Sequence, residues 1–226
     1  MKQTIKTAWI STIPVMTGYL VLGFGFGIVL KAAGFGISVA LAMSLFIYAG
    51  SMQYVAVGLL TGGASLLTAA FTTLMVNARH LFYGISMLDK YKGVGKKKWY
   101  LIFSLTDETY SLVCNENLPV EEKQRGNYYF FVSLFDQIYW VLGTALGSLA
   151  GTLLQFNSEG IDFALTALFL TVFLEQWFTN KNHVPAIIGV AASVISLFLF
   201  GKEHFLIPAM LFITVLLCCY KEESHE

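Results

Sequence analysis

Charged residues are scarce in this 226-residue chain. Asp, Glu, Lys and Arg together make up 12% of it, and 56% of its residues are hydrophobic. Ordinary soluble domains carry about 25% charged residues. Several apolar stretches reach the roughly 20 residues that a helix needs to cross a bilayer, and the mean hydropathy is +0.67. This composition excludes a soluble globular protein and predicts an all-α polytopic membrane protein.

Several functional motifs are also missing. The net charge is zero and no basic domain stands out, which argues against nucleic acid as a partner. Cys114, Cys218 and Cys219 fit neither a disulfide framework nor the spacing of a metal site, so we expect no metal and no cofactor. No GxxxxGK[ST], HExxH, GxSxG or CxxC sequence occurs, and no nucleophile is paired with a base. We therefore expect a protein that is not an enzyme.

Apolar segments follow one another along the whole chain, with no soluble domain or low-complexity linker between them. We place them at about 8–30, 38–60, 64–88, 99–114, 128–154, 161–178, 184–200 and 205–220. The prediction is a helical bundle of about six to eight apolar segments, some of them broken or not spanning, that forms a single integral membrane domain over residues 1–226.

The distribution of Lys and Arg between the loops indicates that not every segment crosses. If all eight crossed from an inside N-terminus, six of these residues would fall inside and seven outside, and the basic loop 89–98 would be exported. If 99–114 dips in without crossing and 8–30 is broken and returns, 12 of the 13 fall inside. If 8–30 crosses instead, the split is 10 to 3. Both arrangements put 89–98 and Lys181 in the cytoplasm and leave the side of the N-terminus open.

Two segments carry signals of interruption. Segment 99–114 is short and has Thr106, Asp107, Glu108 and Thr109 at its centre, and segment 8–30 contains Pro14 and several glycines. Interrupted helices at membrane depth are tolerated where they are buried in protein or line a cavity, and secondary transporters build substrate sites from them. The glycines are equally consistent with close packing between helices.

The run VNARHLFYGI (76–85) places Asn77, Arg79 and His80 inside an otherwise oily segment. A charged residue near the bilayer centre costs roughly 2.5–3.5 kcal/mol on insertion scales and usually faces a bundle interior or a cavity. A helical wheel of 64–88 puts a polar stripe from Thr68 to Ser86 opposite an apolar one. The alternative is that Arg79 lies near the cytoplasmic end and extends to the interface.

Three other segments also carry polar residues, which are candidate partners for the polar stripe of 64–88. Asp136 lies on a face with Gly143, Gly147 and Gly151, whose four-residue spacing allows another helix to approach closely. Gln53 lies on a face of small residues, where a plain hydrogen bond between helices is the alternative. Asp107 and Asp136 are both natural partners for Arg79, and the sequence does not choose between them.

These residues predict a transporter for a small polar or zwitterionic solute. A cationic group would bind a carboxylate, an anionic group would bind an ammonium, and buried carboxyls and histidine can carry a coupled proton. The candidate residues for the substrate or proton pathway are Arg79, Asn77, His80, Gln53, Asp107, Glu108 and Asp136. The alternatives are a permease or channel subunit for another small solute, and a membrane enzyme or scaffold that does not transport.

Three runs also carry a family resemblance. AGSMQYVAVGLL (49–60), VNARHLFYGISM (76–87) and LTDETYSL (105–112) resemble the AzlC family, the large subunits of branched-chain amino acid exporters. The resemblance implies a permease of the bacterial inner membrane that works with a small AzlD-like hydrophobic subunit. It implies proton-driven efflux of leucine, isoleucine and valine, with methionine as a further candidate. The matching positions are Gln53, Asn77, Arg79, His80, Asp107 and Glu108.

Overall fold

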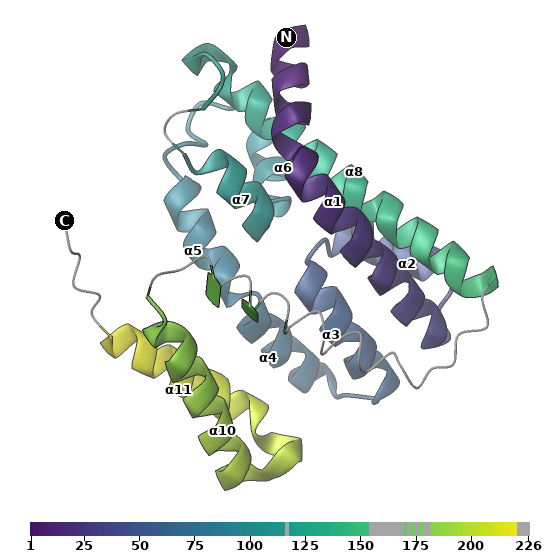
Figure 1. Ribbon diagram of the computed structural model, residues 1–226, viewed down its shortest axis with the longest axis vertical. Helices are drawn as coiled ribbons and strands as arrows, with labels where there is room; N and C mark the ends of the chain where they lie inside the picture. The colour runs from purple at the N-terminus through teal and green to yellow at the C-terminus, as the bar shows by residue number, and fades with distance from the viewer. Residues whose placement is uncertain (116–117, 154–169, 171–172, 175–176, 179–181, 221–226) are drawn as a thin grey trace. The chain divides into compact units, whose positions relative to one another are not determined.

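Helices account for all the regular secondary structure in the computed structural model, which describes residues 1–115, 118–153, 170, 173–174, 177–178 and 182–220 (Figure 1). The all-α prediction is confirmed. The chain divides into two compact units, Met1–Ala164 and Leu165–Glu226, and each is described by itself. Most of the segment expected at 161–178 lies outside the described residues. The single domain expected over 1–226 stays a prediction.

Two long helices form the frame of the first unit. α1 (Lys2–Ala32) has 31 residues, and α8 (Arg125–Leu153), which follows the short 3-10 helix η1 (Glu122–Gln124), has 29. They run parallel, because Thr4 at the start of α1 donates a hydrogen bond to Gln124, while Gly151 lies against Lys31 near the ends of both helices (Figure 1). The N-terminus and the start of α8 therefore lie at the same end of the unit.

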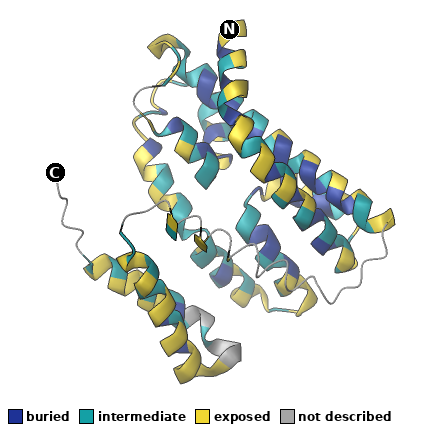
Figure 2. Ribbon diagram, in the orientation of Figure 1, coloured by how far each residue is buried: buried dark blue, intermediate teal, exposed yellow. Residues whose placement is uncertain are grey.

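Glycines let α1 and α8 approach closely. A Cβ atom on Gly27 would lie 2.5 Å from the backbone nitrogen of Ser148, and one on Gly143 would lie 2.7 Å from the carbonyl oxygen of Leu20. Buried residues accordingly follow both helices (Figure 2). Of the two arrangements left open for segment 8–30, the broken one is wrong, because α1 is continuous through Pro14. Its glycines serve close helix packing instead, and α1 tolerates the one hydrogen bond that Pro14 cannot make.

Each of the next three apolar segments consists of two short helices. They are α2 (Ile37–Phe46) and α3 (Gly50–Thr61), α4 (Leu66–Val76) and α5 (Ala78–Met87), and α6 (Lys97–Phe103) and α7 (Asp107–Val113). We expected an interruption only in the third segment, and the continuous helices assumed for 38–60 and 64–88 were wrong. Tyr48 has a left-handed backbone (φ 44°), which ends α2, and Asn77 leaves helical geometry between α4 and α5.

α2 and α3 form a hairpin that enters from the end where α1 stops. Ser44, near the end of α2, donates a hydrogen bond to Thr144 of α8 (3.1 Å). Gly50 at the start of α3 lies against the ring of Trp140, and Tyr54, one turn later, donates to the carbonyl of Leu22 in α1 (2.6 Å). The chain thus turns at mid-depth and returns to the side it came from.

α6 and α7 form a second hairpin from the opposite end, beside the N-terminal half of α1 (Figure 1). Lys97 at the start of α6 donates to Asn127, and Tyr100 donates to Gln137, which lies farther along α8 (2.7 Å). The carbonyl that follows α7 accepts a hydrogen bond from Lys90, back at the end where α6 began. The prediction that segment 99–114 dips in without crossing agrees with this geometry.

α4 and α5 together cross between the two ends. Leu67, Leu74, Leu81 and Ile85 are exposed, as the predicted apolar stripe requires of a lipid-facing surface. The first unit therefore contains a crossing, α1, followed by the hairpin α2–α3. The pair α4–α5 then crosses in the opposite direction and is followed by the hairpin α6–α7. Such inverted repeats are a common plan of secondary transporters.

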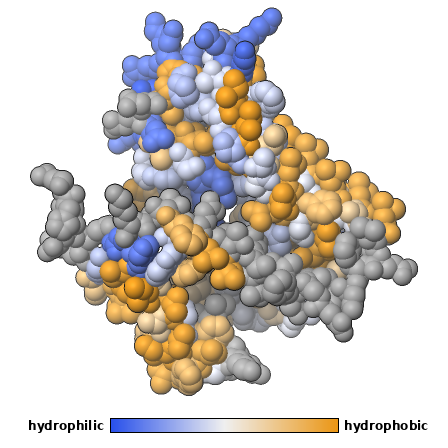
Figure 3. All heavy atoms as spheres, viewed as in Figure 1, coloured by the Kyte–Doolittle hydropathy of each residue, from blue (hydrophilic) through white to orange (hydrophobic). Residues whose placement is uncertain are grey.

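The end of the first unit that holds the N-terminus is hydrophilic (Figure 3), and most of the positive charge of the unit lies there. Residues 1–164 contain eleven Lys and Arg residues. Nine lie at this end, on the start of α1, in the segment 90–98 and around η1: Lys2, Lys6, Lys90, Lys92, Lys96, Lys97, Lys98, Lys123 and Arg125. Of the other two, Lys31 lies at the far end and Arg79 lies between the ends.

The second unit contains α10 (Val184–His204), which is kinked at Gly201 (φ 71°), and α11 (Leu206–Cys219). Among the described residues, three helices are long and apolar enough to cross a membrane: Lys2–Ala32, Glu122–Leu153 and Val184–Gly201. Val190, Val194 and Phe198 are exposed along α10, as expected of a surface that contacts lipid.

The α1–α8 contact predicts a position-dependent effect of added methyl groups. Gly27→Ala should destabilise the protein by about 1–3 kcal/mol, the usual cost of overpacking. Gly18→Ala, in the same helix, meets nothing within 4 Å and should be neutral or slightly stabilising, because alanine favours helix. Thermal unfolding of the purified proteins in detergent measures both. Equal melting temperatures for the two variants would contradict the close packing.

Candidate transport site

The guanidinium of Arg79 joins three of the short helices. Arg79 lies in the first turn of α5, forms an ion pair with Asp107, the first residue of α7, and donates a hydrogen bond to Ser51 in the first turn of α3 (2.8 Å). The structure thus selects Asp107 over Asp136 as the partner of Arg79. The side chain is held by groups on two other helices, in the middle of the first unit.

The sequence at the start of α7 explains why a helix begins there. Thr106 is the N-cap, and its hydroxyl accepts a hydrogen bond from the backbone nitrogen of Thr109 (3.3 Å). Asp107 and Glu108 follow in the first turn, where the partial positive charge of a helix N-terminus favours acidic side chains. A threonine followed by two acidic residues is a recognised start signal for a helix, and the interruption expected at these residues in segment 99–114 is where α7 begins.

The ion pair is partly accessible. The side chain of Arg79 is 36% exposed and that of Asp107 is 26% exposed. The side-chain oxygen of Asn77 and the Nε atom of Arg79 are buried without a hydrogen-bond partner in the described part of the chain. His80 lies next to them, with Nδ1 3.2 Å from the carbonyl oxygen of Asn77. The site therefore has unused donor and acceptor capacity beside a charged pair.

A chain of hydroxyl groups connects two carboxyl groups next to this pair. The hydroxyl of Tyr19 donates to Glu108 (2.7 Å) and lies 2.6 Å from the hydroxyl of Thr106. Thr106 in turn donates to Thr109 (3.2 Å), and Thr109 donates to Asp136 (2.7 Å). Nothing in the sequence pointed to Tyr19, because its partners lie about ninety residues away.

Asp136 is fully buried, together with Ser133, Trp140, Gly143 and Gly147 on one face of α8. The predicted buried face of α8 is confirmed. One carboxyl oxygen accepts the hydrogen bond from Thr109, and the other has no partner among the described residues. Arg79 is paired with Asp107 and Lys92 with Asp89, and neither carboxyl oxygen of Asp136 has a cation as its partner among the described residues.

Gln53 lies outside this hydroxyl chain. Its side chain is fully buried, accepts a hydrogen bond from the indole of Trp140 (3.0 Å) and donates to Ser44 (3.3 Å). The amide therefore links α3 to α2 and α8, which is the helix-contact alternative considered for this residue. Sequence reasoning missed Ser44 and Trp140, whose polar atoms complete this link.

The segments that build the site are those that carry the family relationship. The family model described as AzlC protein matches residues 14–154, which include every candidate site residue. The chain belongs to the AzlC family. Its similarity to the Branched-chain amino acid transport protein AzlC of Bacillus subtilis is 49% identity over 206 residues, 91% of this chain and 81% of that protein.

The chain is also similar to two membrane proteins with less specific names. An uncharacterized membrane protein of Haemophilus influenzae is 44% identical over 216 residues, 95% of this chain and 88% of that protein. The Inner membrane protein YgaZ of Escherichia coli is 29% identical over 192 residues, 81% of this chain and 78% of that protein. No solved structure matches the chain. The relatives and the helical fold identify the chain as a membrane transporter and not an enzyme, as predicted.

The ion pair predicts energetic coupling between Arg79 and Asp107. The test is a double-mutant cycle of Arg79→Gln and Asp107→Asn. The stability losses of the two single variants should add up to more than the loss of the double variant. The expected coupling is about 1–3 kcal/mol, typical of side chains in direct contact. Chemical or thermal unfolding in detergent measures it.

The chain contains a matched control for this cycle. Lys92 and Asp89 form an ion pair whose side chains are both largely exposed, so Lys92→Gln with Asp89→Asn should give a coupling below about 1 kcal/mol. Equal couplings for the two pairs would mean that Arg79 and Asp107 behave as a surface pair.

Proposed function

We propose that this chain is the large subunit of an exporter of branched-chain amino acids, working with a small AzlD-like membrane subunit. Leucine, isoleucine and valine are the proposed substrates, with methionine as a further candidate. The observation that carries the proposal is the Arg79–Asp107 ion pair at the junction of three short helices. The name of the Bacillus subtilis relative supports the substrate class.

The charges of the pair match those of an amino acid. Arg79 and the N-terminal ends of α3 and α5 favour a carboxylate, since helix N-termini carry partial positive charge. Asp107 favours the ammonium group. The carboxylate of a bound zwitterion can thus pair with Arg79 and its ammonium group with Asp107. Each side chain then keeps a partner of opposite charge when the ion pair between them opens. The free side-chain oxygen of Asn77 supplies a further acceptor beside them.

The hydroxyl chain supports proton coupling. When Glu108 carries a proton, its carboxyl donates to the Tyr19 hydroxyl, which turns and donates to Thr106 instead of Glu108. The protons of Glu108, Tyr19, Thr106 and Thr109 can then each shift one position, so that Glu108 loses a proton and Asp136 receives one. Every hydroxyl is neutral before and after the transfer. Intramembrane carboxyl groups commonly form such relays. In this scheme Glu108 and Asp136 carry the proton, His80 is a further titratable group near the substrate, and Gln53 holds the helices that frame the site.

We propose that the basic end of the first unit faces the cytoplasm of a bacterium, with the chain in its inner membrane. Nine of the eleven Lys and Arg residues of this unit lie at that end, and cytoplasmic loops are enriched in these residues. The N-terminus and the loop 89–98 are then both cytoplasmic. The second unit, in this proposal, belongs to the same membrane domain over residues 1–226.

Cysteine labelling tests this orientation. In a chain whose three cysteines are replaced by serine, Ser38→Cys should react with a membrane-impermeant maleimide added to intact cells, because residue 38 follows the outer end of α1. Lys96→Cys should react only after the cells are permeabilised. The reverse pattern would contradict the orientation.

Amino acid efflux tests the transport function. Bacteria loaded with dipeptides would express no transporter, this chain alone, or this chain with its small partner. We expect faster efflux of leucine, isoleucine and valine with both chains, and loss of that difference when the proton gradient is collapsed. Unchanged efflux with both proteins in the membrane would reject the substrate class, and gradient-independent efflux would reject proton coupling.

Variants separate substrate binding from proton coupling in the same assay. Arg79→Ala should abolish efflux while the protein still inserts, whereas Lys6→Ala, which removes an exposed cation far from the site, should not. Tyr19→Phe keeps the ring but interrupts the hydroxyl chain, so it should preserve exchange of substrate and lose its dependence on the proton gradient. Tyr91→Phe is the matched control, because the buried hydroxyl of Tyr91 has no partner in the described residues.

A further inference from the structure

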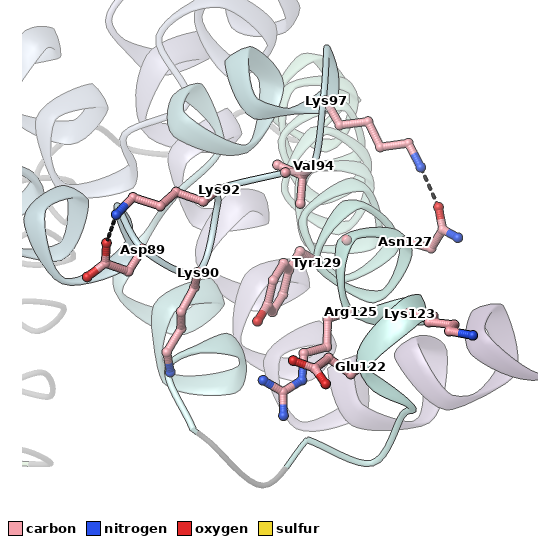
Figure 4. Close-up of a pocket in the computed structure, with 12 residues that line it drawn as sticks. Asp89, Lys90, Lys92, Val94, Lys97, Glu122, Lys123, Arg125, Asn127 and Tyr129 are labelled. Carbon is pink, nitrogen blue, oxygen red and sulfur yellow. Dashed lines mark hydrogen bonds and ion pairs between the residues drawn. The ribbon is translucent and has the colours of Figure 1, made fainter.

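A basic cavity of about 510 Å³ lies at the same end of the first unit as the N-terminus (Figure 4). It is formed by the loop after α5 and by the residues around the start of α8. Five cations line it: Lys90, Lys92, Lys97, Lys123 and Arg125. The acidic lining residues are Asp89 and Glu122, so the lining has a net charge of +3, five minus two.

Three of the five lining cations, Lys90, Lys97 and Lys123, are not paired with an acid among the described residues. Lys92 pairs with Asp89, and its hydrogen bond lowers the pKa of that carboxyl, which keeps the pair ionised. Lys97 donates to the side-chain oxygen of Asn127 (Figure 4). Lys90 donates to the backbone carbonyl of Cys114, so both lysines bond neutral acceptors. Lys123 has no hydrogen bond or ion pair to any residue that the structure describes.

Two glycines and a packing contact shape the loop that carries the lysines. Gly93 and Gly95 both have left-handed backbones (φ 83° and 64°), which fold the loop back toward α8. Val94 between them packs against Gly126, where a Cβ atom would lie 2.8 Å from the Val94 side chain. Behind them Tyr129, only 2% exposed, contributes to the wall of the cavity. The cavity is therefore built into the fold.

The surroundings place this cavity at the depth of lipid head groups. The apolar run of α8 begins with Tyr128, directly after the lining residues Arg125–Asn127. Trp99, two residues after Lys97 in α6, is 81% exposed, and exposed tryptophan is typical of the membrane–water interface. Basic pockets between membrane helices on the cytoplasmic side bind the phosphates of anionic lipids.

We propose that this basic cavity binds the phosphate group of an anionic phospholipid. The acyl chains of the lipid lie along the apolar surface of the neighbouring helices. A free phosphate ion shares the same chemistry but lacks the acyl chains, so the two sources can be distinguished. The site is separate from the Arg79–Asp107 pair and does not depend on which solute is transported.

Lipid retention by the purified full chain tests the proposal. The protein in neutral detergent would be titrated with phosphatidylglycerol or phosphatidylcholine, and bound lipid counted by native mass spectrometry. The chain should retain phosphatidylglycerol in preference to phosphatidylcholine. The triple variant Lys90→Gln, Lys97→Gln, Lys123→Gln should bind phosphatidylglycerol about 100-fold more weakly, from the usual contribution of each lysine to anionic-lipid binding.

A second triple variant controls for charge alone. Lys2→Gln, Lys6→Gln and Lys31→Gln remove the same charge outside the cavity and should leave phosphatidylglycerol binding within about threefold of the unmodified chain. An equal loss in both triple variants would overturn the proposal, as would equal retention of the two lipids. Displacement of phosphatidylglycerol by millimolar inorganic phosphate would also overturn it and assign the cavity to a soluble anion. Thermal melting of each variant confirms that it is folded.

Discussion

Three apolar segments of the first unit are interrupted, between α2 and α3, α4 and α5, and α6 and α7. The backbone groups left unpaired at these interruptions are the constraint on which the rest of the unit depends. Inside a bilayer no water is available to bond them, so irregular backbone must be buried in protein or line a cavity. Here the interruptions lie together, and Gln137 of α8 donates a hydrogen bond to the backbone carbonyl of Leu45 near the end of α2 (3.4 Å). Arg79 holds the starts of α3 and α7, and the hydroxyl of Thr106 caps α7. The polar site exists because the helices stop there.

The contact between α1 and α8 makes this arrangement possible. Gly27 and Gly147 bring the two backbones together, so that Tyr19 on α1 and Asp136 on α8 can both reach the residues at the start of α7. Larger residues at the glycine positions would separate the helices and lengthen these hydrogen bonds. Helix packing without a hydrophobic driving force thus determines the geometry of the polar chain.

Sequence alone was sufficient for the residues whose role follows from one helix. The buried face of Asp136 and the lipid-facing side of segment 64–88 both follow from helical periodicity. Periodicity does not reveal where a helix stops, so the breaks near Tyr48 and at Asn77 were missed. The glycines of segment 8–30 were consistent with both a break and a tight contact, and only the partner helix decides between them. Tyr19 was missed because its role depends entirely on distant partners.

The two parts of the site are linked through neighbouring residues of α7. Asp107 pairs with Arg79, and Glu108, the next residue, accepts the hydrogen bond that begins the hydroxyl chain to Asp136. In the proposed cycle an amino acid draws Asp107 away from Arg79, which shifts the first turn of α7. That shift alters the contact between Glu108 and Tyr19, because both acidic residues are on the same short helix. Substrate binding and proton transfer then both change the position of α7. Two events are coupled when they act on the same structural change in this way.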